Sequence, residues 1–93
     1  MTQKKATATF IVINDKGLHT RPSAELVKCA CMFKSQMTLH YQDNVVNAKS
    51  LLSILTLAAS RGAKITVEAI GEDAEEAVQS ILDLAKNKFR ITY

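Results

Sequence analysis

The change from a strand pattern to a helix pattern within residues 6–33 constrains the fold of this chain more than any other feature. Residues 6–13 (Ala-Thr-Ala-Thr-Phe-Ile-Val-Ile) have the composition of a β-strand. In residues 23–33, positions 23, 26, 27, 30 and 33 form a stripe at intervals of three and four, which indicates one face of a helix. The octapeptide 17–24 therefore spans a strand-to-helix turn, and it contains His19.

The composition of this turn suits an imidazole that carries a phosphoryl group. The first backbone N–H groups of a helix have no intrahelical partner and lie at the positive end of its dipole, so they favour a negative group near His19. Arg21 adds a planar cation, and Gly17 permits a tight turn. Pro22 is tolerated because its missing N–H would be unpaired in a first helical turn. We therefore predict that Arg21, with the helix start at Thr20 and Arg21, stabilises a phosphoryl group on His19.

Three segments of the chain resemble signatures of one family. Residues 17–23 (Gly-Leu-His-Thr-Arg-Pro-Ser) resemble the active site of HPr, the histidine-containing phosphocarrier family of the phosphoenolpyruvate:sugar phosphotransferase system. Residues 47–52 (Asn-Ala-Lys-Ser-Leu-Leu) and 61–65 (Arg-Gly-Ala-Lys-Ile) resemble two further family segments. The resemblance implies that His19 is phosphorylated at Nδ1, as a pros-phosphohistidine. It also implies a stoichiometric carrier, without cofactor or metal, rather than a turnover enzyme.

The resemblance also implies partners. The chain is expected to accept a phosphoryl group from phosphorylated enzyme I and to pass it to the enzyme IIA domains of sugar permeases. Leu51, Leu52 and Leu55 are candidate docking residues for both, although plain core packing explains each of them equally well. The protein is expected to be a monomer.

Ser50 has two readings. It stands where the N-cap of a second helix is expected, with its hydroxyl directed at unpaired N–H groups. It also fits a regulatory phosphorylation site for an HPr kinase/phosphorylase, since a phosphate at a helix start is electrostatically favourable. The family often has glycine at the positions of Ser53 and Ala58, and both residues here favour a regular helix over residues 50–60.

The remaining patterns complete an α+β fold. Residues 36–41 and 64–70 alternate as half-buried strands, and 45–47 is a short returning strand. Asp73 and Glu76 have the spacing of a capping box that opens a third helix, and we expect the buried stripe of that helix to contain Ala74, Ala77, Val78, Ile81, Leu82 and Ala85. The order β-α-β-β-α-β-α predicts a single domain over residues 1–93. The resemblance implies an HPr-like open-faced β-sandwich, a four-stranded antiparallel sheet with three helices on one face.

Bulk properties exclude several classes of protein. No run approaches the ~20 apolar residues of a membrane span, and the start of the chain lacks a convincing signal peptide, so we expect a cytoplasmic protein without membrane insertion. Cys29 and Cys31 would point to nearly opposite sides of a helix, so we expect half-buried reduced thiols and no shared metal. The five aromatic residues are scattered, which argues against nucleic-acid binding.

Charge favours acidic or phosphorylated partners. Residues 1–64 contain nine Lys and Arg against three Asp and Glu, whereas residues 65–93 contain three against six. Two alternatives to the sugar relay stay open. One is the carrier of the nitrogen-related regulatory branch of the phosphotransferase system. The other is a regulatory binding module that relays no phosphate, against which the presence of His19 argues.

Overall fold

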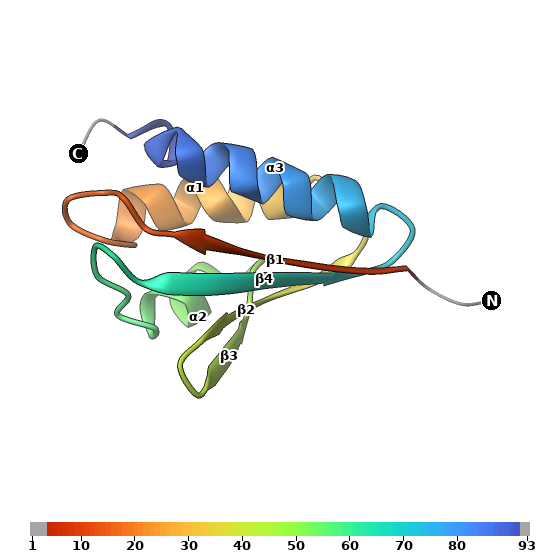
Figure 1. The fold of residues 1–93 in the computed structure, drawn as a ribbon, viewed down its shortest axis with the longest axis horizontal. Coiled ribbons are helices and arrows are strands. Elements are labelled where there is room, and N and C mark those ends of the chain that lie inside the picture. The colour runs from red at the N-terminus through yellow and green to blue at the C-terminus, as the bar shows by residue number, and fades with distance from the viewer. Residues whose placement is uncertain (1–3, 92–93) are drawn as a thin grey trace.

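A computed structural model describes residues 4–91 of the chain. Its strands and helices alternate in the predicted order β-α-β-β-α-β-α, followed by one short 3-10 turn (Figure 1). The elements are β1 (Lys5–Ile11), α1 (Thr20–Ala30), β2 (Gln36–Tyr41), β3 (Asn44–Asn47), α2 (Leu51–Leu55), β4 (Lys64–Ile70), α3 (Ala74–Lys86) and η1 (Lys88–Arg90).

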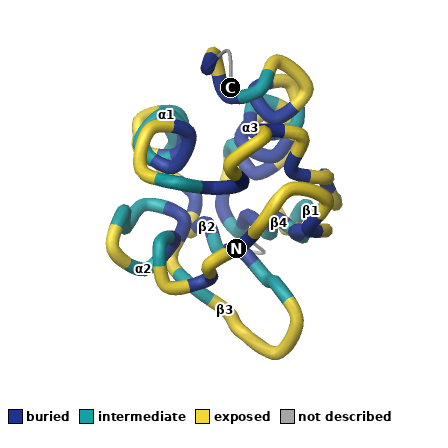
Figure 2. Tube along the Cα trace, turned by 90° about the vertical axis from the view of Figure 1, so that its left-hand side faces the viewer, coloured by how far each residue is buried: buried dark blue, intermediate teal, exposed yellow. Residues whose placement is uncertain are grey.

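The four strands form one antiparallel sheet in the order β1-β4-β2-β3. The chain reaches this order because β4, the last strand, enters between β1 and β2. In the register, Phe10 lies opposite Ile65 on β4, and Leu39 lies opposite Val67. The three helices cover one face of the sheet, as the views of Figures 1 and 2 show, so the predicted open-faced α+β sandwich is confirmed.

The core lies between the sheet and the helices, where Figure 2 shows the buried parts of the trace. Strand β4 shows the alternation most cleanly, with Ile65, Val67 and Ala69 fully buried and the residues between them half-exposed. Strands packed on one face only are expected to alternate in this way. Leu26 of α1 and Ile81 of α3 meet this face from above, and both are fully buried.

Helix α1 is shorter than its apolar stripe predicts. It ends at Ala30, so Phe33 lies beyond it, although that side chain still packs partly buried against the core. The two cysteines differ as a result. Cys29 is half-buried as expected, but Cys31 caps the helix and is exposed, so the prediction of a half-buried thiol at Cys31 is wrong.

Helix α2 is much shorter than the predicted 50–60. It ends at Leu55, and Ala58 takes a left-handed backbone conformation with φ +50°, which no α-helix can contain. The expectation that Ala58 favours a regular helix is therefore wrong. Gly62 lies well beyond the end of this helix, in the turn before β4.

Helix α3 begins at Asp73 as predicted, but without the capping box. The Asp73 side chain makes no capping hydrogen bond within the described structure and instead accepts three hydrogen bonds from Lys34 and Ser35, just before β2. The buried stripe differs in one position, because Leu84 is buried and Leu82 only partly so. No helix in residues 4–91 is long and apolar enough to cross a membrane.

Candidate functional site

His19 is the N-cap residue of α1. Its backbone is extended, with φ −78° and ψ −171°, and Ser23 N–H already donates to its carbonyl oxygen at 3.0 Å. The side chain is half-buried, and its Nε2 atom is turned inward and buried. The predicted helix start at this turn is confirmed.

The backbone on either side of His19 is held by hydrogen bonds to other elements. Leu18 donates its N–H to the Ala59 carbonyl oxygen at 2.9 Å, and its own carbonyl oxygen accepts from the buried Ser23 hydroxyl at 3.0 Å. Gly17 has φ +70°, and a Cβ atom at this position would overlap the Ala59 carbonyl group. The glycine is therefore required both for its backbone conformation and for the close approach of the loop 58–60.

This loop gives the site a second wall. His19 lies in a surface depression whose other lining residues are Lys16, Leu18, Thr20, Leu55, Ala58, Ala59 and Ser60. Among the residues predicted from the sequence, the depression brings together His19, Thr20 and Leu55. Lys16 and the loop 58–60 were not predicted. Lys16 had a local signal, a cation three residues before the histidine, whereas nothing in the sequence places 58–60 beside it.

The charges around His19 are mostly positive. Thr20 and Arg21 occupy the first two positions of α1 and are exposed, and the first turn of this described helix contains no acidic residue. Asp15, the nearest acid along the chain, is paired with Arg61 at 3.5 Å. Because the N-terminus of a helix and an arginine both attract anions, this arrangement favours a negatively charged group beside the imidazole.

Ser50 is the N-cap of α2, as predicted. Its hydroxyl oxygen accepts a hydrogen bond from the Ser53 N–H at 3.3 Å, and the residue is half-exposed. The three candidate docking leucines differ in exposure. Leu52 is 78 % exposed, which core packing does not explain, while Leu51 and Leu55 are half-buried. Of the three, Leu55 lies beside His19, since both line the same depression.

The described residues contain no group of histidine, cysteine and acidic side chains suited to a metal ion. Burial raises the pKa of the Cys29 thiol, and the Arg90 guanidinium opposes this shift. A raised pKa keeps Cys29 in its thiol form rather than as the thiolate that metals and oxidants require.

The fold and the site together define a class: an open-faced α+β sandwich with a histidine at the start of its first helix. The family model that matches is PTS-HPr, the phosphorylation site of the HPr component of the phosphotransferase system, over residues 6–87. The phosphocarrier protein HPr of Xylella fastidiosa is 43% identical over 80 residues, which cover 86% of this chain and 90% of that protein.

Solved structures agree with this match. HPr-C-His from Thermoanaerobacter tengcongensis superposes with a TM-score of 0.89 and 36% identity, over 95% of this chain and 99% of that one. An HPr dimer from the same organism has a TM-score of 0.73 and 41% identity, over 86% and 93% of the two chains. The chain belongs to the HPr family, the phosphocarriers of the phosphotransferase system.

Proposed function

We propose that this chain carries a phosphoryl group on Nδ1 of His19, accepting it from phosphorylated enzyme I and delivering it to enzyme IIA domains of sugar permeases. One observation carries the choice of atom: Nε2 is buried while the half-buried ring opens into the depression at the start of α1. In this role the protein is a stoichiometric carrier in the cytoplasm, and it acts as a monomer.

The surroundings of His19 explain how the group is received. The imidazole attacks the phosphorus of the donor phosphohistidine through the Nδ1 lone pair, and the bond to the donor nitrogen breaks. In this proposal the phosphoryl oxygens are attracted by the N-terminal end of α1 and by the charge of Arg21, the second residue of that helix. Their attraction must stay moderate, because a group held too tightly would not leave for the next acceptor.

Docking is assigned to the exposed surface beside the site, formed by Leu51, Leu52 and Leu55. Leu52 is the best candidate because a leucine exposed to 78 % gains most from a partner's apolar surface. The variant Leu52→Ala is expected to raise the KM for phosphorylation by enzyme I several-fold with little change in kcat. Val45→Ala, which removes another exposed side chain from β3, is the matched control and should leave KM unchanged.

Ser50 is proposed as a regulatory phosphorylation site. Its hydroxyl is half-exposed at the start of α2, immediately before Leu51 and Leu52. A phosphate there would place about two negative charges in the docking surface and weaken the binding of enzyme I. Treatment with an HPr kinase/phosphorylase should therefore give an acid-stable adduct that Ser50→Ala abolishes.

The decisive experiment is intact-mass analysis after incubation with enzyme I and phosphoenolpyruvate. We expect one phosphoryl adduct, removed by acid and absent from His19→Ala, while His40→Ala keeps it. His40 is a suitable control because it lies on β2, where its ring is hydrogen-bonded to Thr38. Charging by the enzyme I homologue of the nitrogen-related branch instead would assign the chain to that branch. Absence of any adduct with either enzyme would contradict the relay and favour a regulatory binding module.

A further inference from the structure

The C-terminal turn η1 has an unusual backbone. Lys88, Phe89 and Arg90 all have left-handed conformations, with φ values of 54°, 54° and 63°. Such a backbone is unfavourable for residues with a side chain, because Cβ comes too close to the following carbonyl oxygen. The turn buries Phe89 completely, with its ring edge-to-face against Phe10 of β1 at 5.9 Å between centroids. Burial of this ring offsets the backbone cost and holds the turn in place.

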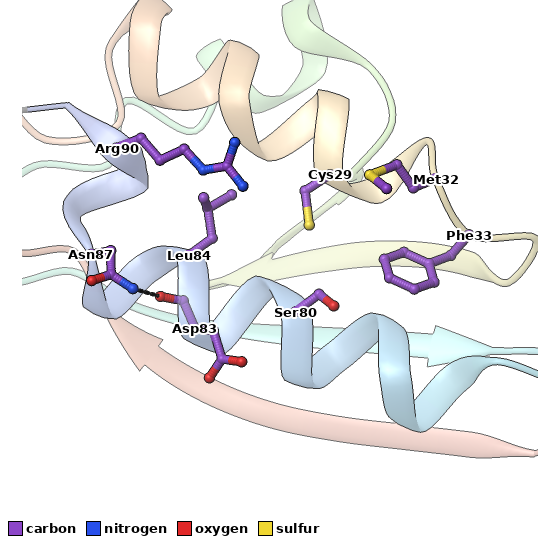
Figure 3. A pocket seen from close by; sticks show the side chains of 8 residues that line it. All are labelled: Cys29, Met32, Phe33, Ser80, Asp83, Leu84, Asn87 and Arg90. Carbon is purple, nitrogen blue, oxygen red and sulfur yellow. Dashed lines mark hydrogen bonds between the residues drawn. The ribbon is translucent and has the colours of Figure 1, made fainter.

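The turn contacts the first helix as well as the third. Arg90 extends across Leu84 of α3 toward Cys29 of α1, as Figure 3 shows. The hydrogen bond from Asn87 to the Asp83 carbonyl oxygen, 2.8 Å long, stays within the end of α3. The C-terminal turn is thus seated over the junction of α1 and α3.

A third contact links this turn to the loop that carries His19. The side-chain Nδ2 of Asn14 donates to the Lys88 carbonyl oxygen at 2.9 Å, and Asn14 is fully buried. The backbone carbonyl oxygen of Asn14 accepts a hydrogen bond from the Gly17 N–H at 3.0 Å, which closes the turn that leads into Leu18 and His19. Asn14 therefore connects the C-terminal turn η1, through its side chain, to the turn before His19, through its backbone.

We propose that Asn14 is a positioning residue for His19 and that it acts by fastening the histidine loop to the C-terminal turn Lys88–Arg90. The reactive role of His19 is that of the proposed function, on which this inference rests. Two anchors of the loop come from neighbouring elements, the Ala59 carbonyl oxygen and the Ser23 hydroxyl. Both of them hold Leu18, and the Lys88 carbonyl oxygen is a third anchor, which holds the loop four residues further upstream, at Asn14. Small displacements of a reacting group lower its rate steeply, so loss of this anchor should slow phosphoryl transfer.

The first test compares two asparagines. Asn14→Ala removes the link to the Lys88 carbonyl oxygen, whereas Asn87→Ala removes a hydrogen bond of the same kind that stays within α3. The readout is the imidazole 1H–13C spectrum of the folded protein, which contains only two histidines. We expect the His19 signal to shift in Asn14→Ala and to stay in place in Asn87→Ala. The His40 signal, from the far side of the sheet, should be unchanged in both.

The second test changes Lys88, the acceptor of the Asn14 hydrogen bond, and can be used if Asn14→Ala does not fold. Lys88→Pro cannot keep φ +54°, because the proline ring holds φ near −65°. Lys88→Gly accepts that conformation without strain and is the matched control. The His19 signal should shift in the proline variant only. In both tests, the variants with a shifted signal should be phosphorylated about tenfold more slowly by enzyme I at unchanged KM.

The two readouts separate this inference from the proposed function. The spectrum requires no phosphoryl donor, so it reports on the position of His19 even if enzyme I never charges the protein. Unchanged His19 signals in folded Asn14→Ala or Lys88→Pro would overturn the positioning role. An equal shift of the His40 signal would also overturn it, because it would indicate a general rearrangement.

Discussion

The N-caps of helices α1 and α3 each follow a glycine with positive φ, but the first turns of the two helices carry opposite charges. Each N-cap is preceded by one residue and a glycine with positive φ: Gly17 before His19, and Gly71 before Asp73. In both cases the glycine is pressed against another segment, the Ala59–Ser60 backbone for Gly17 and Ser35 for Gly71. The two starts share this glycine contact but not the backbone of the N-cap, which is extended at His19 (ψ −171°) and not at Asp73 (ψ 24°).

The side chains divide the two helix starts by function. Helix α3 has Glu75 and Glu76 in its first turn, and the Asp73 carboxylate is held by Lys34 and Ser35 at distances of 2.5 to 3.0 Å. Its dipole is compensated by the protein's own carboxylates. Helix α1 starts with a histidine and an arginine, and its described first turn has no acid. The comparison teaches that acidic residues in the first turn compensate the dipole of α3, whereas their absence from α1 suits the phosphoryl chemistry proposed for His19.

The strongest test of this difference is to place an acidic residue in the first turn of α1, as in α3. Arg21→Glu places a carboxylate in the first turn, so the helix should be as stable as before or slightly more so. Phosphorylation of His19 should fall by about a hundredfold or more, because the carboxylate repels the incoming phosphoryl oxygens. Arg21→Gln, which removes the charge without reversing it, should lose about tenfold. Denaturant unfolding and rates of charging by enzyme I measure the two effects, and an undiminished rate in Arg21→Glu would contradict the role of Arg21.

The close contact that the two glycines share is tested by substituting each with alanine. Gly17→Ala and Gly71→Ala each combine a positive φ with a steric overlap, so each should lower the free energy of unfolding by about 3 kcal/mol. Gly62→Ala is the control, since its φ is +91° but no atom lies within 4 Å of an added Cβ, and it should lose only about 1 kcal/mol. Only Gly17→Ala should also slow phosphorylation. If urea unfolding showed equal losses of unfolding free energy at all three glycines, the steric overlaps at Gly17 and Gly71 would add nothing to the cost of the substitution.

The hydrogen-bonded Asp73 carboxylate at the start of α3 predicts that the stability of the protein depends on pH. Hydrogen bonds from Ser35 and the Lys34 N–H lower the pKa of Asp73. Because the folded-state pKa lies below the unfolded value of about 3.9, the stabilisation is fully present above that pH and is lost as pH falls through the folded-state pKa. Asp73→Asn should therefore be less stable than wild type at pH 7, with a smaller difference at pH 3. Thermal unfolding at both pH values measures it, and Glu76→Gln, which removes a charge from the same turn, should show a weaker trend.

The smallest effect is expected at the start of α2, the remaining helix. Ser50→Ala removes the hydroxyl that accepts from the Ser53 N–H and should lower the free energy of unfolding by about 1 kcal/mol. Ser50→Asp keeps a capping oxygen and should retain most of the stability, yet its charge should weaken docking of enzyme I. A large loss of stability in Ser50→Asp would indicate that the cap site cannot hold a charge, which would argue against regulation by phosphorylation there.

Much of the fold could be predicted because it depends on local pattern. The strand β4 alternates so regularly that its buried residues are the predicted ones, and the helix start at His19 follows from the residues around it. The end of α2 could not be predicted in this way. Ala58 is a good helix former, but the Ala59 carbonyl oxygen must reach Leu18, and that long-range hydrogen bond turns the chain out of the helix.

The sequence by itself singled out His19 as the residue proposed to carry the chemistry and predicted which faces of the strands are buried, since both follow from spacing and from the physics of helix ends. Only the tertiary structure decided what surrounds His19. The Leu18 N–H reaches the Ala59 carbonyl oxygen in the loop 58–60, and Asn14 reaches Lys88, 74 positions along the chain. At the start of α3, Asp73 likewise binds Ser35, 38 positions away. Such contacts arise when the sheet order brings distant loops to the same end of the molecule, and no local pattern records them.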